Sequence, residues 1–97
     1  MTLLEKTYIN LHSIGLVACA EAFSADYLGK NRNWYAFQKY TGRDFSVAAA
    51  VQCLRSVRLK QRNAQLPKQQ QVTLQQLEQQ LLAHLNEKHS VADVLET

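Results

Sequence analysis

The first apolar pattern in the chain is that of a short amphipathic helix near the N-terminus. Leu4, Tyr8 and Leu11 are four and three residues apart, so they share one face of a helix. Thr2 and Glu5 form a capping box in front of this face, because their side chains can satisfy the free amides of the first turn. We therefore predict a helix at the start of the chain.

Isolated glycines divide the next part of the chain into short segments. They are Gly15, Gly29 and Gly42. Glycine is common just past a helix C-terminus, so we predict helices at residues 18–28 and 32–41. Lys30 and Asn31 form the turn between them, with Asn31 as the N-cap of the second helix. Two helices joined by a few residues that include glycine are typical of a helix-turn-helix.

A fourth helix is predicted to begin at Val47, with Ser46 as its N-cap. Its expected buried stripe consists of Val47, Ala50, Val51, Leu54 and Val57. Pro67 disfavours helix in the residue before it and closes this part of the chain. The polar residues 67–72 are predicted to form a linker.

Leucines dominate the C-terminal helix, which Thr73 and Gln76 are expected to cap as a second capping box. They are Leu74, Leu77, Leu81 and Leu85. They fall within an arc of about 80°, which is a narrow seam. Because an isolated helix of this length is marginal in water, the seam must pack on something. We expect it to pair with a second chain in a homodimer; the alternative is that it folds back on the chain's own helices.

Together these elements predict an all-α fold, a compact bundle of four to five helices. Residues 1–66 form a helix-turn-helix-like domain, residues 67–72 the linker, and residues 73–97 a C-terminal dimerisation or packing helix. Ser90 is expected to cap a last helical turn. No apolar run approaches the roughly 18 residues of a membrane span, so we expect a soluble protein.

Positive charge is concentrated in the middle of the chain. The net charge is only +3, but residues 30–68 contain nine Lys and Arg side chains against Asp44 alone, a net charge of +8. The flanking segments are acidic. This distribution indicates a surface for a polyanion in the middle of the chain.

The segment at residues 32–41 combines this charge with aromatic residues. A helical wheel that turns Trp34 inward also turns Phe37, Tyr40 and Thr41 inward. The opposite face then carries Arg32, Ala36, Lys39 and Arg43, with Tyr35 on its border. Together with Lys30 in the turn before the helix, these are the candidate DNA-binding residues. Cations can neutralise phosphates or bind guanine, and a small residue such as Ala36 lets a helix approach base edges.

Residues 18–46 resemble the helix-turn-helix core of lambda-repressor-like regulators of bacteria and phages. The matching features are Phe23, the Leu28-Gly29 pair, the turn Lys30-Asn31-Arg32, the aromatic-bearing helix, Gly42 and the Ser46 cap. The resemblance implies a transcription regulator that binds double-stranded DNA through the helix at residues 32–41. Cys19-Ala20 stand where the family often has a phosphate-contacting glutamine.

The residues that could carry chemistry lack the patterns that chemistry needs. Cys19 and Cys53 match no redox or metal motif and are typical of buried thiols in a reducing cytoplasm. The histidines, His12, His84 and His89, lack ligand spacing. We expect no enzyme activity, cofactor or metal, and a cytoplasmic location.

Two functions remain open from the sequence. The first is a small DNA-binding regulator or accessory factor, acting as a homodimer. The second is a non-enzymatic protein–protein interaction module, such as an adaptor or an inhibitor of another macromolecule. The basic face at residues 32–43 favours the first function, because cationic side chains bind phosphates. Binding of that kind depends strongly on the salt concentration.

Overall fold

The computed structural model describes residues 1–63 and 65–88, and within these ranges the chain forms only helices and loops. The elements in chain order are α1 (Leu3–Ser13), α2 (Ala20–Ala22), the π-helix η1 (Phe23–Tyr27), α3 (Trp34–Tyr40), α4 (Val47–Gln61) and α5 (Lys68–Lys88). The predicted all-α class is confirmed. The turn predicted after Ser90 lies outside the described residues.

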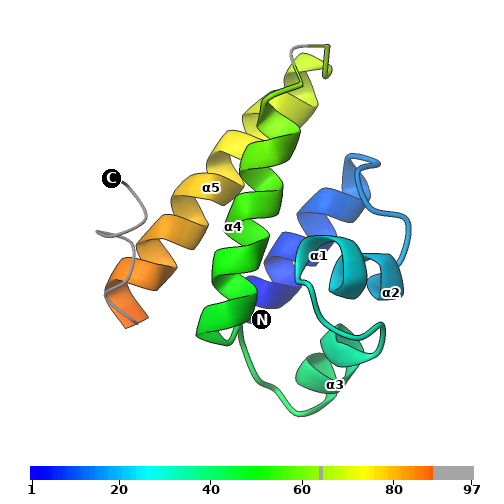
Figure 1. The fold of residues 1–97 in the computed structure, drawn as a ribbon, viewed down its shortest axis with the longest axis vertical. Coiled ribbons are helices and arrows are strands. Elements are labelled where there is room, and N and C mark those ends of the chain that lie inside the picture. The colour runs from blue at the N-terminus through cyan, green and yellow to red at the C-terminus, as the bar shows by residue number, and fades with distance from the viewer. Residues whose placement is uncertain (64, 89–97) are drawn as a thin grey trace.

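The two long helices, α4 and α5, lie side by side, and α1, α2 and α3 gather on the other side of α4 (Figure 1). One core joins these helices. Leu4 of α1, Phe23 of η1 and Leu54 of α4 are almost fully buried in the same cluster as the leucines of α5. The described residues therefore share one core, in which α5 is the packing helix that the sequence analysis gave as one of two alternatives.

The ends of α1 and α4 are formed as predicted. The hydroxyl of Thr2 accepts a hydrogen bond from the Glu5 amide at 3.2 Å, and that of Ser46 accepts one from the Ala49 amide at 3.2 Å. Gly15 has a φ of 79° just after α1, which allows the Leu16 amide to bond the Leu11 carbonyl at 3.0 Å. These caps depend only on neighbouring residues, so the sequence pattern predicts them well.

The predicted stripe of α4 is partly corrected. Ala50, Leu54 and Val57 are buried, but Val47 is 38% exposed. Ala49 and Cys53 are fully buried in addition. The buried face is broader than the predicted stripe because α4 is covered by η1 on one side and by α5 on the other.

α5 begins at Lys68, directly after Pro67, so the predicted linker at residues 67–72 is helical from residue 68 onward. The Gln71 amide bonds the Pro67 carbonyl at 3.1 Å, which makes the proline part of the helix start. Pro67 thus occupies the N-cap position, where its carbonyl accepts the first helical bond and its missing N–H is not needed by the helix. The prediction that Thr73 caps this helix is therefore wrong.

The leucine seam of α5 is buried within the chain itself. Leu74, Leu77, Leu81 and Leu85 are each at most 1% exposed. α5 packs against α4 and α1, which is the folded-back alternative. The prediction that these leucines form a dimer interface is wrong, because the chain's own core already covers them.

The segment before α3 is longer than predicted. α2 starts at Ala20 behind the N-cap residue Cys19, and the helix continues as η1, whose wider π-helical turn the sequence pattern did not predict. α3 begins only at Trp34. Asn31 bonds the Asn33 amide through its side chain at 3.0 Å, so it forms a turn rather than the N-cap.

Candidate nucleic-acid interface

The orientation of α3 differs from the predicted one. Tyr35 and Gln38 are 3% and 8% exposed, whereas Phe37 is 56% and Tyr40 is 91% exposed. Thr41 is exposed as well. The predicted inward face of Phe37, Tyr40 and Thr41 is therefore wrong, and the aromatic residues of that face point to solvent.

Contacts with residues distant in sequence fix this orientation. The Tyr35 ring lies 4.8 Å from the Tyr8 ring and 5.4 Å from the Phe23 ring, measured between centroids. The Tyr35 amide donates to the buried Ser24 hydroxyl of η1 at 3.0 Å. Ser24 thereby satisfies one of the free amides in the first turn of α3, and it fixes α3 against η1.

The far end of α3 is held by Asp44 in the loop before α4. The Gln38 side chain donates to the Asp44 carbonyl at 2.9 Å. The Asp44 carboxylate accepts hydrogen bonds from the amides of Leu3 and Leu4 at 3.3 and 2.9 Å. A carboxylate at a helix N-terminus is favourable, so this acidic side chain stabilises α1. The loop after α3 is tied to the start of the chain.

The outer face of α3 consists of exposed aromatic, small and cationic side chains. Ala36, Phe37, Lys39 and Tyr40 are exposed on the helix. Arg32 precedes α3 and Arg43 follows it, and both are exposed as well. The structure thus keeps the predicted cations on the surface and adds two aromatic side chains that the helical wheel had placed inside.

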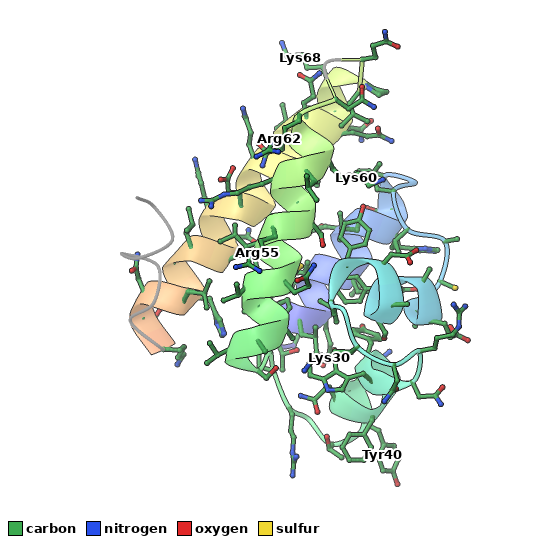
Figure 2. The ribbon with its side chains drawn as sticks, viewed as in Figure 1. Lys30, Tyr40, Arg55, Lys60, Arg62 and Lys68 are labelled. Carbon is green, nitrogen blue, oxygen red and sulfur yellow. The ribbon has the colours of Figure 1, made fainter. Side chains whose placement is uncertain are left out.

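Two of the predicted DNA-binding residues are placed differently from the rest. Tyr35 belongs to the core, so its ring cannot lie on a groove, and this prediction is corrected. Lys30 is half-buried, and its ammonium lies 5.7 Å from the centre of the Trp34 ring. Figure 2 places Lys30 and Tyr40 at the same end of the molecule. The cation–π contact holds Lys30 beside the start of α3.

A hollow of about 490 Å³ adjoins α3. Its lining residues are Tyr8, Ala20, Tyr35, Ala36, Lys39 and Tyr40. Burial raises the pKa of Tyr35 to about 12, with smaller contributions from Glu5 and Tyr8. Tyr35 is therefore neutral at physiological pH and keeps its proton. The hollow is thus lined by tyrosine side chains and one cation, Lys39.

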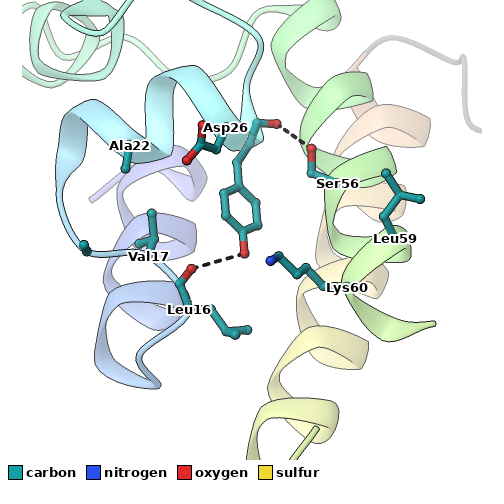
Figure 3. A pocket seen from close by; sticks show the side chains of 9 residues that line it. Leu16, Val17, Ala22, Asp26, Ser56, Leu59 and Lys60 are labelled. Atoms are coloured by element: carbon teal, nitrogen blue, oxygen red, sulfur yellow. Dashed lines mark hydrogen bonds between the residues drawn. The ribbon is translucent and has the colours of Figure 1, made fainter. Parts of the chain in front are cut away.

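A larger hollow of about 570 Å³ lies where the α1–α2 loop, η1 and α4 meet (Figure 3). Burial is the largest of the causes that raise the pKa of Tyr27 to about 12. Its hydroxyl donates to the Leu16 carbonyl at 3.4 Å, and its carbonyl accepts from Ser56 at 3.0 Å. Tyr27 thus joins the loop to α4, so we assign this hollow a structural rather than a chemical role.

Within residues 1–63 and 65–88, no three His, Cys, Asp or Glu side chains lie close enough to hold a metal ion. None of the helices in these ranges is long and apolar enough to cross a membrane. Burial raises the pKa of the Cys53 thiol to about 12, so this thiol is a poor nucleophile. The exposed face of α3 is the strongest candidate site in the described part of the chain.

Residues 4–95 match the sequence profile of a family described as a family of unknown function, DUF6626. The chain belongs to this family. No curated protein matches the chain. No solved structure matches it. The description of DUF6626 gives no activity, so the function must be argued from the interface itself.

Proposed function

We propose that this protein binds double-stranded DNA as a small transcription regulator, with α3 in the major groove. The observation that carries the proposal is the exposed face of α3. Lys39 and Tyr40 are exposed on the helix, and the exposed Arg32 and Arg43 precede and follow it in the sequence. Cations at both ends of a short helix can contact phosphates on either side of a groove. Ala36 and Tyr40 are free to meet base edges between them.

The dimensions of α3 support this proposal. The helix has 7 residues. At about 1.5 Å per residue it is roughly 10 Å long, which suits a major groove about 12 Å wide. η1 and α3, joined by the turn around Gly29, are consistent with the first and second helices of a helix-turn-helix.

The local charge balance also supports phosphate binding. Asp44 is the acidic residue closest in sequence to Arg43, and its carboxylate is engaged by the amides at the start of α1. Among the described residues it forms no ion pair with Arg43. The Arg43 guanidinium is therefore not held by the neighbouring carboxylate and can bind a phosphate in a bidentate manner.

A homodimer is part of this proposal, because twofold symmetry lets two copies of α3 reach half-sites about 34 Å apart. The leucines of α5 are not available for its interface. The dimer therefore requires another surface of the chain. With the resemblance to regulators of bacteria and phages, the proposal places this DNA-binding role in the cytoplasm.

Fluorescence anisotropy with a mixture of random duplexes tests the proposal. We expect binding at about 50 mM salt that weakens steeply as salt rises. Lys39→Gln/Arg43→Gln should lower the magnitude of the salt slope by about 2, because roughly one counterion is released per contact. Lys68→Gln/Lys88→Gln removes the same charge from the two ends of α5 and is the matched control. No binding by the wild type at tens of micromolar protein would overturn the proposal.

A protein–protein interaction module remains the second candidate function. The exposed rings of Phe37 and Tyr40 favour it, because aromatic residues are enriched at protein interfaces. An interface of this kind depends mainly on buried apolar area and is far less sensitive to salt. A Phe37→Ala/Tyr40→Ala variant that keeps its full DNA affinity would show that these rings serve another partner.

A further inference from the structure

The middle and end of α4 carry three arginines on one face. Arg55, Arg58 and Arg62 are spaced three and four residues apart, so their side chains share one side of the helix. They line a shallow hollow of about 320 Å³ together with Leu59, which is 61% exposed. Figure 2 shows Arg55 and Arg62 on the same side of α4. We refer to the three arginines as the arginine stripe.

The charge of the arginine stripe is only partly compensated. α4 contains no acidic residue, and like charges at this spacing repel one another. The carboxylate of Glu78 on α5 lies 2.7 Å from Arg58, and it also accepts a hydrogen bond from Gln61 at 2.8 Å. Arg55 and Arg62 are exposed and form no ion pair with another described residue. Two guanidinium groups are thus free to bind an anion.

The spacing of these two groups suits a regular polyanion. Seven residues of helix separate Arg55 from Arg62, a rise of about 10 Å along the axis. One DNA strand presents a phosphate about every 3.4 Å along its axis, so this distance spans about three phosphates. Guanidinium groups bind carboxylates as well, but a repeating backbone matches the spacing without requiring a particular protein sequence.

The arginine stripe belongs to a different surface from the face of α3. α4 packs on α5 and η1, whereas α3 packs on α2 and η1. In Figure 2, Tyr40 lies at one end of the molecule and Arg62 lies toward the other end. A short duplex held by α3 therefore leaves the arginine stripe open to a second segment.

We propose that the arginine stripe is a second phosphate-binding surface, so that one molecule holds two DNA segments. This inference rests on the proposed function, since α3 must hold the first segment. It adds a consequence: the protein bridges or wraps DNA rather than only occupying one site.

A two-duplex capture assay tests the inference. A biotinylated duplex is fixed on streptavidin beads, the protein is added, and a second, fluorescent duplex is offered. We expect the wild type to retain the fluorescent duplex. Arg55→Gln/Arg62→Gln should retain roughly tenfold less while still binding a single duplex in anisotropy. Lys60→Gln/Lys68→Gln, with the same loss of charge outside the stripe, should retain as much as the wild type.

The outcomes separate this inference from the proposed function. Wild-type protein that binds one duplex but captures no second one overturns the inference and leaves the proposed function standing. Undiminished capture by Arg55→Gln/Arg62→Gln overturns it as well, because the second duplex is then held elsewhere. A further outcome concerns the Lys39→Gln/Arg43→Gln variant. If poly-L-glutamate binds this variant as tightly as duplex DNA does, the arginine stripe is assigned to acidic protein segments and the inference is overturned. Absence of any DNA binding refutes the proposed function itself.

Discussion

At the scale of single residues, the two cysteines differ in their surroundings. Cys53 is fully buried in α4, and burial raises the pKa of its thiol to about 12. Cys19 is half-buried at the start of α2, where its sulfur accepts the Ala22 amide at 3.5 Å. The attacking species in thiol chemistry is the thiolate, so burial of this kind suppresses reactivity at neutral pH.

We predict that the native protein has one thiol that reacts quickly with Ellman's reagent and one that reacts only on unfolding. Cys19→Ser should remove the fast phase, and Cys53→Ser should leave it in place. The measurement is the absorbance time course in buffer and in guanidinium chloride. Two thiols with equal rates in the native protein would contradict the packing described for Cys53.

Individual side chains also explain where sequence reasoning succeeded and where it did not. Thr2 and Ser46 were predicted correctly because a cap bonds an amide three residues away. Tyr35 was misplaced because its burial depends on Tyr8 and Ser24, which lie on other elements. A wheel that turns Trp34 inward misplaces the other residues, because Trp34 is itself only half-buried beside Lys30.

At the scale of elements, the contact between α4 and α5 combines apolar packing with one ion pair. Glu78 of α5 is partly buried, which raises its pKa, but hydrogen bonds from Arg58 and Gln61 and the charge of Arg58 outweigh burial. The net effect lowers the pKa below the ordinary value of 4.5. The ion pair therefore stabilises the folded state fully at pH values above 4.5. That contribution is lost as the pH falls through the lowered pKa of Glu78.

Glu78→Gln should destabilise the protein by about 0.5–1 kcal/mol at neutral pH, the range of partly exposed pairs in moderate salt. The difference between variant and wild type should shrink as the pH falls from the ordinary pKa of a glutamate through the lowered pKa of Glu78, below which the wild type is protonated in both states. Urea denaturation at a series of pH values measures this. Glu87→Gln removes an exposed charge from the same helix and should show a smaller effect. An equal loss in both variants would argue against the Arg58–Glu78 pair.

The candidate site was predictable in its cations but not in its aromatic residues. Arg32, Lys39 and Arg43 are exposed as the charge pattern indicated, because charged side chains rarely enter a core. That rule says nothing about aromatic side chains, and Phe37 and Tyr40 lie outside although the helical wheel turns them inward. The arginines of α4 could have been recognised from their spacing, but nothing local indicates that Glu78 compensates only one of them.

At the scale of the whole molecule, α5 completes the core. Its leucines are buried against α4 and α1. Removing α5 would therefore expose the apolar surface of these two helices. The sequence pattern identified the seam but could not show which surface covers it, because two partners satisfy a narrow apolar stripe equally well. The packing of the other helices decides between them.

We predict that Leu77→Asp unfolds the protein, because it places a charge in the core. Gln76→Asp, one residue earlier and exposed, should leave the fold intact. Leu77→Ala should cost about 2–5 kcal/mol, as large-to-small core substitutions do. Circular dichroism and thermal melting distinguish these variants. A Leu77→Asp protein that stays folded as a monomer would contradict this packing. It would instead support the prediction that the leucines of α5 form a dimer interface.

The packing of α5 also bears on how the chain folds during synthesis. The ribosome releases the N-terminus first, at about 5–20 residues per second. Leu4 of α1 shares its core cluster with Leu85 of α5, which is made later. The hydrogen bonds from the Leu3 and Leu4 amides to the Asp44 carboxylate likewise form only after α3 has been made. A nascent chain therefore leaves the side of α4 that α5 covers exposed until α5 has been made, so fragments that stop before α5 are expected to be substrates for chaperones and proteases.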